Sequence, residues 1–276
     1  MIPSIVYNIP ALMAGSFPGR NIVVRSADPS EIIQSLEHVD VKRLSYLQIL
    51  GTGGAIDSLM RWEYSTPIDL VIQDPVSDLP QLYRYSPLVA ERPVRVTVRV
   101  APGFSKLVKL ALSLNFAVKL EILQPEPDLI EELLQVASLY LHSSTVSQPV
   151  EFIHSIFWSF YNKHPVTLWT IQEEDPACMR YITDIGTETI SQRLTGVESQ
   201  YPLSSFVEKF TEVLRHDRQE CGDCEFFVNC AGYFKWPMKD YRCSGMKYLF
   251  HTLWTAAEEL RADIASIRSP EQDNRP

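Results

Sequence analysis

Long hydrophobic runs are missing from this sequence. The longest apolar stretches, such as Val166–Ile171 and Leu129–Leu141, fall well short of the roughly 20 residues that a membrane-spanning helix needs. We therefore expect neither a membrane anchor nor a membrane partner. The first ten residues also lack the basic start and uninterrupted apolar stretch of a secretory signal, which predicts a cytoplasmic protein.

An excess of basic residues is also missing. The chain has 25 Lys and Arg against 34 Asp and Glu, a formal net charge of −9. An acidic chain repels phosphate backbones, so we expect no nucleic-acid partner. The basic stretch Arg92, Arg95, Arg99, Lys106 and Lys109 is interpreted as the solvated faces of a strand and a helix. No nucleophile elbow, Ser/His/Asp signature or zinc-protease motif is found, so no catalytic residue is predicted.

The length of 276 residues suits one large domain or two small ones, with a core that needs no metal or disulfide to hold it. Short β-branched runs alternate with helical segments, which predicts an α/β fold with a parallel sheet. Periodicity alone leaves open whether this sheet is doubly wound or a partial barrel. The expected strands are Ile22–Val24, Tyr46–Leu50, Asp69–Ile72, Arg95–Val100, Val118–Leu123 and Thr167–Ile171.

Helical periodicity marks further segments of the chain. The expected helices are Ser30–His38, Leu79–Val89, Phe104–Leu114, Pro127–His142, Pro202–Arg215 and Gly245–Ile267, while the aromatic run Val150–Tyr161 has no clear period. Composition shifts near residue 200. We therefore expect a first domain over residues 1–200, a second over 201–268, and a disordered tail over 269–276.

Four of the five cysteines lie within 23 residues, as Cys221, Cys224, Cys230 and Cys243, with the spacing C-x2-C-x5-C-x12-C. In a cytoplasmic chain, clustered thiols are more often metal ligands than disulfides. Thiolate-only ligation suits an iron-sulfur cluster or a structural zinc ion, and spacing does not decide between them. A site without metal is the third possibility. Cys178 stands alone and is interpreted as a small buried hydrophobic residue.

The cysteine run resembles the SPASM domain, the auxiliary-cluster module of many radical SAM peptide-modifying enzymes. The similarity covers Cys221-x2-Cys224-x5-Cys230, the glycine-aromatic stretch Ala231–Phe234 and the later Cys243. The family continues its run with x3-Cys, where this chain has Phe234, and has two earlier cysteines that are absent here. The resemblance implies the ligand set of one [4Fe-4S] cluster, with the second cluster lost.

The front of the chain resembles a radical SAM barrel that has lost its chemistry. No cysteine precedes Cys178, so the C-x3-C-x2-C motif that holds the S-adenosylmethionine-cleaving cluster is absent. The turn Gly51-Thr-Gly-Gly54-Ala55 resembles the family's Gly-Gly-Glu motif with alanine in place of the carboxylate, although a tight turn explains it equally well. The resemblance implies a degenerate radical SAM-like partial (β/α) barrel, followed by a small cysteine-rich SPASM-like domain and a C-terminal helix.

The resulting hypothesis is an iron-sulfur accessory protein that binds one [4Fe-4S] cluster and partners a radical SAM enzyme, a precursor peptide, or both. It would transfer electrons or bind peptide, without cleaving S-adenosylmethionine by itself. Two alternatives stay open. One is a zinc-organised protein- or peptide-binding module, with Zn2+ held by the same cysteines. The other is an enzyme with unrelated chemistry at Gly51–Ala55 and Glu173–Asp175, although the latter segment is more simply an exposed turn.

Overall fold

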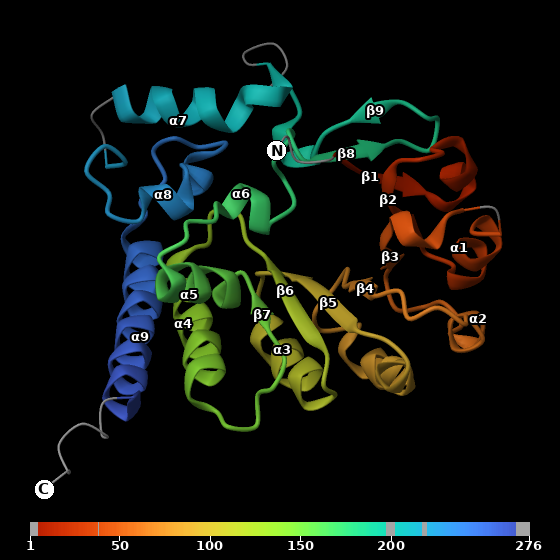
Figure 1. Ribbon diagram of the computed structural model, residues 1–276, viewed down its shortest axis with the longest axis horizontal. Coiled ribbons are helices and arrows are strands. Elements are labelled where there is room, and N and C mark those ends of the chain that lie inside the picture. Colours follow the sequence, from red (N-terminus) through yellow and green to blue (C-terminus); the bar gives the residue numbers. More distant parts are fainter. Residues whose placement is uncertain (1–4, 38, 197–201, 217–219, 269–276) are drawn as a thin grey trace, which may run out of the picture.

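The computed structural model describes residues 5–37, 39–196, 202–216 and 220–268. The predicted disordered tail, 269–276, lies outside the described residues. These residues form an α/β fold around one nine-stranded sheet with the order β7-β6-β5-β4-β3-β2-β1-β8-β9 (Figure 1). The strands are β1 (Val6–Pro10), β2 (Asn21–Ser26), β3 (Leu44–Leu50), β4 (Ile68–Val71), β5 (Val94–Arg99), β6 (Ala117–Glu121), β7 (Val150–Glu151), β8 (Met179–Ile182) and β9 (Glu188–Thr189).

Helices connect most of these strands. The α-helices are α1 (Pro29–Ser35), α2 (Asp57–Met60), α3 (Phe104–Ser113), α4 (Pro127–His142), α5 (Ile153–Asn162), α6 (Leu168–Ile171), α7 (Phe206–His216), α8 (Phe227–Cys230) and α9 (Ser244–Arg268). The 3-10 helices are η1 (Ala11–Ser16), η2 (Val41–Arg43), η3 (Leu79–Ala90), η4 (Gln192–Leu194), η6 (Leu203–Ser205) and η7 (Tyr233–Lys235). No helix among the described residues is both long and apolar enough to cross a bilayer.

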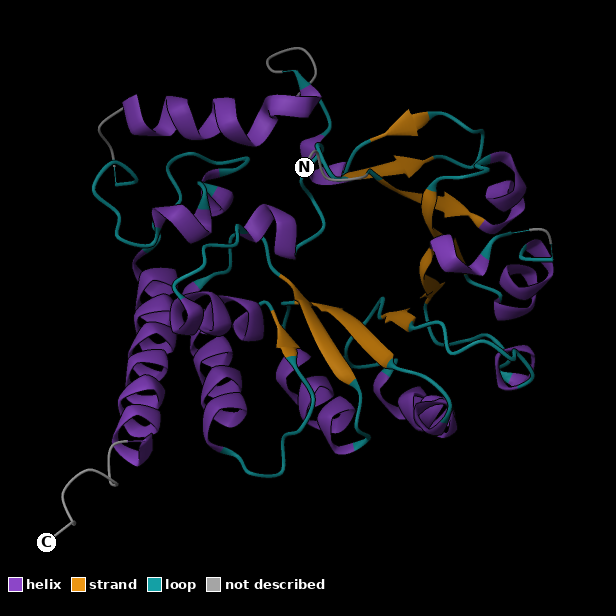
Figure 2. Ribbon diagram, in the orientation of Figure 1, coloured by secondary structure: helices purple, strands orange, loops and turns teal. Residues whose placement is uncertain are grey.

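All neighbouring strands are parallel except β8 and β9, which pair antiparallel. From β1 to β7 each strand lies beside the next one in the chain, so right-handed crossovers place their helices on one face. Figure 2 shows these helices around the outside of the curved sheet. The other face of the sheet therefore encloses the interior of the molecule.

Alternation along each strand divides the side chains between the two faces. In β5, Val94, Val96 and Val98 are buried and belong to the hydrophobic core, while Arg95 and Arg99 occupy the alternate positions. The same period places Asp69 of β4 beside Arg95 in the register. The outward face of the sheet is thus apolar under the helices, and the inward face is rich in charge.

The segment after residue 200 packs against the end of the sheet through aromatic side chains. The ring of Trp169, in α6, lies 5.3 Å from Phe206 and 4.8 Å from Tyr233 between centroids, and its indole N–H donates to the Ala231 carbonyl at 2.9 Å. Helix α9 packs along α5 and α4, as Figure 1 shows. Buried rings therefore fix α7 and the segment around Tyr233 to α6.

Most expected elements agree with the structure, including the five strands from Ile22 to Leu123 and the long C-terminal helix. The expected strand Thr167–Ile171 is wrong. Its residues form the helix α6, because the Thr167 side chain accepts a hydrogen bond from the Thr170 N–H and caps the turn. The strand Val6–Pro10 was not expected, and it shifts the count: Gly51–Ala55 follows the third strand of the chain, whereas the radical SAM resemblance places it after the second.

Candidate functional site

The four clustered cysteines lie around a single small cavity. Cys221 and Cys224 lie in the turn before α8, Cys230 is the last residue of α8, and Cys243 immediately precedes α9. All four line one small cavity of about 20 Å³, whose remaining walls are mostly apolar. These walls include Phe226, Phe227, Phe234, Met246 and Phe250. The structure therefore brings together the thiols that the sequence analysis grouped.

Tight packing and a reversal of the chain produce this arrangement. After Cys230, Ala231 and Gly232 both adopt positive φ, 47° and 72°, and turn the backbone toward η7. A Cβ on Gly232 would lie 2.3 Å from Leu214 Cδ1, so a larger residue fits there only if the Leu214 side chain moves. Cys178 lies elsewhere, just before β8, where its carbonyl accepts from the Val6 N–H at 2.8 Å. It does not line the cysteine cavity.

A charged trio of Glu220, Lys235 and Lys247 borders the thiols, and Lys235 is buried. The Glu220 carboxylate accepts from Lys235 Nζ at 2.8 Å and from Lys247 Nζ at 3.1 Å, and the Lys235 side chain is only 5% exposed. The Lys235 ammonium also donates to the Tyr241 carbonyl. With both lysines charged and Glu220 ionised, the trio carries one net positive charge. A positive group at this place stabilises anionic thiolates.

Without a bound metal the thiols favour their neutral form. Burial raises the pKa of Cys230 to about 12 and that of Cys243 to about 12, in the second case against the opposing influence of Lys235. Burial also raises the pKa of Cys221. Because metal ligation needs thiolates, binding of a metal here must displace protons from these cysteines.

The donor set can be compared with the two metal groups that use four thiolates. A zinc ion needs four sulfurs at about 2.3 Å from one point. Among the described residues, which include all four cysteines, no three His, Cys, Asp or Glu side chains are placed to hold one metal ion. A [4Fe-4S] cluster needs no such convergence, because each thiolate binds a different iron. Four thiols around one apolar cavity, with no histidine in its lining, are a donor set that suits either group.

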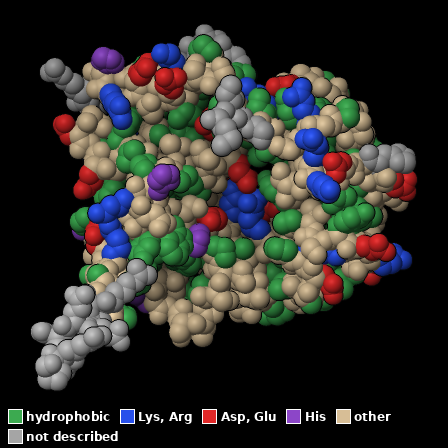
Figure 3. Space-filling view, viewed as in Figure 1, with side chains coloured by type: hydrophobic (Ala, Val, Ile, Leu, Met, Phe, Trp, Pro, Cys, Tyr) green, Lys and Arg blue, Asp and Glu red, His purple; other side chains and the backbone are tan. Residues whose placement is uncertain are grey.

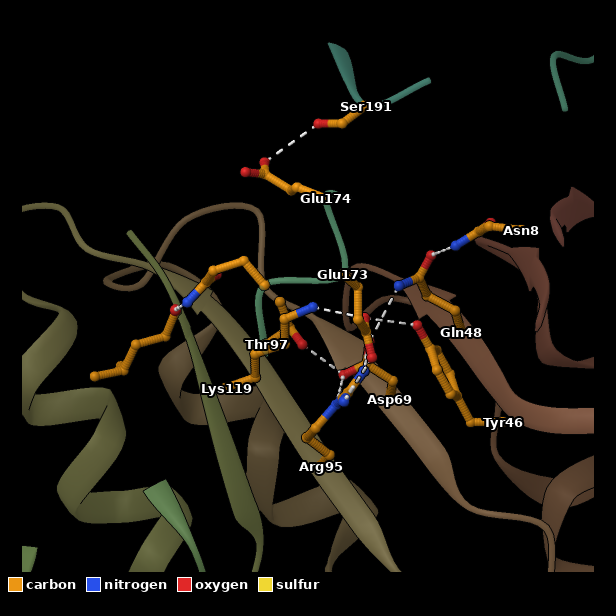
Figure 4. Close-up of polar contacts among 12 residues, drawn as sticks. Asn8, Tyr46, Gln48, Asp69, Arg95, Thr97, Lys119, Glu173, Glu174 and Ser191 are labelled. Carbon is orange, nitrogen blue, oxygen red and sulfur yellow. Dashed lines mark hydrogen bonds and ion pairs between the residues drawn. The ribbon is translucent and has the colours of Figure 1, made fainter. Parts of the chain in front are cut away.

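A second feature is a buried ion-pair network inside the curved sheet, centred on Arg95 (Figure 4). The guanidinium of Arg95 donates to both oxygens of Asp69 at 3.1 Å and to Glu173 Oε1 at 3.2 Å. Lys119 Nζ donates to Glu173 Oε2 at 2.6 Å, and the Tyr46 hydroxyl donates to the same oxygen at 2.9 Å. Strands β3, β4, β5 and β6 are thereby tied to the turn after α6.

Further polar side chains extend this network across the sheet. Thr97 Oγ1 donates to Asp69 Oδ1 at 2.6 Å, Gln48 Nε2 donates to Asp69 Oδ2 at 3.0 Å, and Asn8 Nδ2 donates to Gln48 Oε1 at 2.9 Å. The Asp69 side chain is 1% exposed, so its charge depends on these partners. The network therefore runs from β1 to β6.

Two expectations about these residues are wrong. Arg95 does not lie on a solvated strand face. It lies on the inward face of the curved sheet, where it is ion-paired with Asp69 and Glu173. Glu173 and Glu174 do not form an exposed turn, since both side chains are largely buried and ion-paired. Burial alone would raise the pKa of Glu173, but Lys119 and Arg95 outweigh it and lower that pKa to about 2.

A large cavity of about 940 Å³ opens above the network, at the carboxyl ends of β3 to β6. Its lining includes Lys119, Glu121, Glu173 and Glu174, but none of the residues Gly51–Ala55. A Cβ on Gly54 would lie 2.4 Å from Pro29 Cδ, so close packing against α1 accounts for that glycine. The alternation of charged and apolar residues in β5 and β6 was the only sequence signal for the charged interior.

The fold and the cysteine cavity together define an α/β protein with a candidate thiolate metal site. Comparison of the chain with protein-family models, with curated proteins and with solved structures finds no match. The function is therefore argued from the residues of this chain.

Proposed function

We propose that this protein is an iron-sulfur protein that binds one [4Fe-4S] cluster through Cys221, Cys224, Cys230 and Cys243. The observation that carries the proposal is the placement of all four thiols around one apolar cavity. Thiolate-only ligation suits such a cluster, in which each thiolate binds a different iron. The net positive charge of Glu220, Lys235 and Lys247 suits the anionic assembly that four thiolates and a cluster form.

The proposed role is that of an accessory subunit beside a radical SAM enzyme in peptide maturation, where the cluster would carry electrons. The similarity of the cysteine run to the SPASM domain supports this role. A parallel sheet with its crossover helices on one face is compatible with a degenerate radical SAM-like partial barrel. Since no cysteine precedes Cys178, this chain has no ligand set for a cluster that cleaves S-adenosylmethionine.

Two cysteine variants test the ligand set. In protein purified and reconstituted without oxygen, Cys243→Ser should lower the iron and sulfide content sharply, because it removes one of four ligands. Cys178→Ser is the matched control, since this residue lies outside the cavity, and it should leave both contents unchanged. Equal iron content in the two variants would refute the assignment.

The accessory role makes a separate prediction about chemistry. Reconstituted and reduced protein, incubated alone with S-adenosylmethionine, should release no 5′-deoxyadenosine. Release of that product by the purified chain, measured by chromatography and mass spectrometry, would contradict the accessory role without affecting the ligand assignment.

A further inference from the structure

Two buried cations of the large cavity are paired with protein carboxylates. Figure 3 shows acidic and basic side chains together in a hollow near the centre of the molecule. Lys119, which is 5% exposed, is ion-paired with Glu173, and Arg193 is ion-paired with Glu174. A charged ligand would have to break such a pair to use these groups. A buried charge without a protein partner is therefore the better indicator of a further binding site.

Arg92 carries a charge of this kind. It lies between η3 and β5, and only 5% of its surface is exposed. Its Nη2 donates to the Trp62 carbonyl at 2.7 Å, whereas its Nε and Nη1 are buried without a hydrogen-bond partner among the described residues. Burial lowers the pKa of Arg92, although the nearby charge of Glu91 opposes this shift. A guanidinium keeps its proton at neutral pH, so these nitrogens need acceptors that the described chain does not supply.

A cavity of about 420 Å³ lies beside Arg92, at the amino ends of β4, β5 and β6. It is therefore at the end of the strands opposite to the large cavity. Arg92 belongs to its lining, together with Arg95, Asn115 and Gln148, and Glu91 is the one acidic residue of that lining. The volume falls within the range of small-molecule sites. The cavity thus offers space for a ligand next to an unpartnered guanidinium.

The polar groups of this lining favour a ligand that accepts hydrogen bonds. Asn115 Oδ1 accepts from Gln148 Nε2 at 2.9 Å and from Ser147 Oγ at 3.1 Å, so the NH2 group of Asn115 remains available for another acceptor. Arg95 adds a second cation, although its own N–H groups belong to the ion-pair network described above. Carboxylate and phosphate oxygens are the acceptors that form the strongest hydrogen bonds with a guanidinium. The lining therefore favours an anionic group.

We propose that this cavity binds the carboxylate or phosphate group of a small molecule through the unpartnered N–H groups of Arg92. These nitrogens have no free surface in this structure, so the guanidinium turns toward the cavity when the anion binds. The anion then supplies the acceptors that the protein lacks, and its charge offsets the cost of burying the guanidinium. The site shares no lining residue with the cysteine cavity, and it does not depend on a metal.

Anion binding by the metal-free full-length chain tests this site. The probes are inorganic phosphate and succinate, each titrated by calorimetry into protein in chloride buffer at constant ionic strength. We expect saturable binding, and the anion that binds more strongly shows which group the site takes. The same anion should raise the melting temperature, by about 3 °C at a tenfold excess over its Kd.

Two variants separate this site from a general effect of salt, since phosphate stabilises folded proteins without binding to a specific site. Arg92→Met removes the charge and keeps a long side chain, so it should weaken binding at least tenfold and abolish the extra stabilisation by the anion. Arg43→Met is the matched control. Arg43 is a surface arginine that pairs with Asp40 at the amino end of β3, outside the cavity lining, so its replacement should leave the affinity unchanged.

Stability in chloride alone distinguishes a binding role from a structural one. Under these conditions Arg92→Met should be as stable as the wild type or more stable, because an apolar side chain replaces a buried charge that lacks a partner. Saturable anion binding that is lost in Arg92→Met, together with this stability, supports the proposal. No saturable binding of either anion, equal binding by wild type and Arg92→Met, or a clear loss of stability in Arg92→Met without anion would overturn it.

Discussion

Replacement of Glu173 by glutamine should remove a large, pH-dependent part of the stability of the fold. The carboxylate accepts from Lys119, Arg95 and Tyr46 at 2.6 to 3.2 Å, and its side chain is 23% exposed. Its pKa falls from the ordinary 4.5 to about 2. At about 1.4 kcal/mol per pKa unit, this lowering corresponds to about 3 kcal/mol of stability at neutral pH. The charge-free variant Glu173→Gln should lose about that amount.

The sign of the pH dependence follows from the direction of the shift. A carboxyl group with a lowered pKa in the folded state contributes stability above its unfolded pKa, and the contribution disappears as the pH falls through the folded value. Between pH 7 and pH 3, about 2 kcal/mol of the contribution of Glu173 should be lost. The stability difference between wild type and Glu173→Gln should therefore shrink from about 3 to about 1 kcal/mol over this range.

Urea unfolding curves at several pH values measure this difference. Glu212→Gln is the control, because Glu212 forms an exposed ion pair with Lys209 at 3.0 Å and should change stability by about 0.5 kcal/mol or less at any pH. A difference between wild type and Glu173→Gln that stays constant with pH, or that is below about 1 kcal/mol at neutral pH, would refute the description of the network.

Three further changes test packing and electrostatics. Gly54→Ala should lower the free energy of unfolding by about 1–3 kcal/mol, because its Cβ would lie 2.4 Å from Pro29 Cδ. Gly53→Ala is the control and should be nearly neutral, since a Cβ there has no atom within 4 Å. Urea unfolding of the two variants measures the difference. Lys235→Gln should move the reduction potential of the proposed cluster to more negative values, because a positive charge beside the thiolates is lost. An unchanged potential in a redox titration would count against the proposed electrostatics. Tyr233→Phe should cost about 1–3 kcal/mol in thermal unfolding, because it removes a buried hydroxyl whose single proton lies between two acceptors at 2.8 Å, Glu174 Oε2 and the Ile122 carbonyl. No loss of stability would mean that this hydroxyl does not stabilise the fold.

Local patterns predicted most of the sheet, but not the direction in which its polar face points. The alternation of Val94, Val96 and Val98 with Arg95 and Arg99 identifies a half-buried strand correctly. It does not reveal whether the polar side faces solvent or the interior. The partner of Arg95 that decides the matter, Glu173, lies 78 residues further along the chain. Only the fold brings the two together.

Two errors in secondary structure concern short segments whose structure depends on distant parts of the chain. The short run Thr167–Ile171 is apolar and β-branched, and a run of this length does not separate a strand from one turn of buried helix. The strand Val6–Pro10 ends at a proline and pairs with two strands. One of them is β2, and the other is β8, which lies about 170 residues further along the chain. Its pairing could not be read from the neighbouring sequence.

The cysteine cluster was the part of the candidate site that the sequence indicated most directly. The spacing of the four cysteines grouped residues that line one cavity, whereas Cys178, interpreted as a small buried residue, lies outside this cavity and is partly exposed. The charged trio of Glu220, Lys235 and Lys247 was not foreseen, because its members are spread over 28 positions without a motif.

Iron, sulfide and zinc content of the wild-type chain tests the central claim most directly. The protein would be purified and reconstituted without oxygen, and its metals and absorption spectrum measured on the same sample. The account predicts about four irons and four sulfides per chain, with the broad visible absorption of a cluster. One zinc ion per chain and a colourless protein would contradict it.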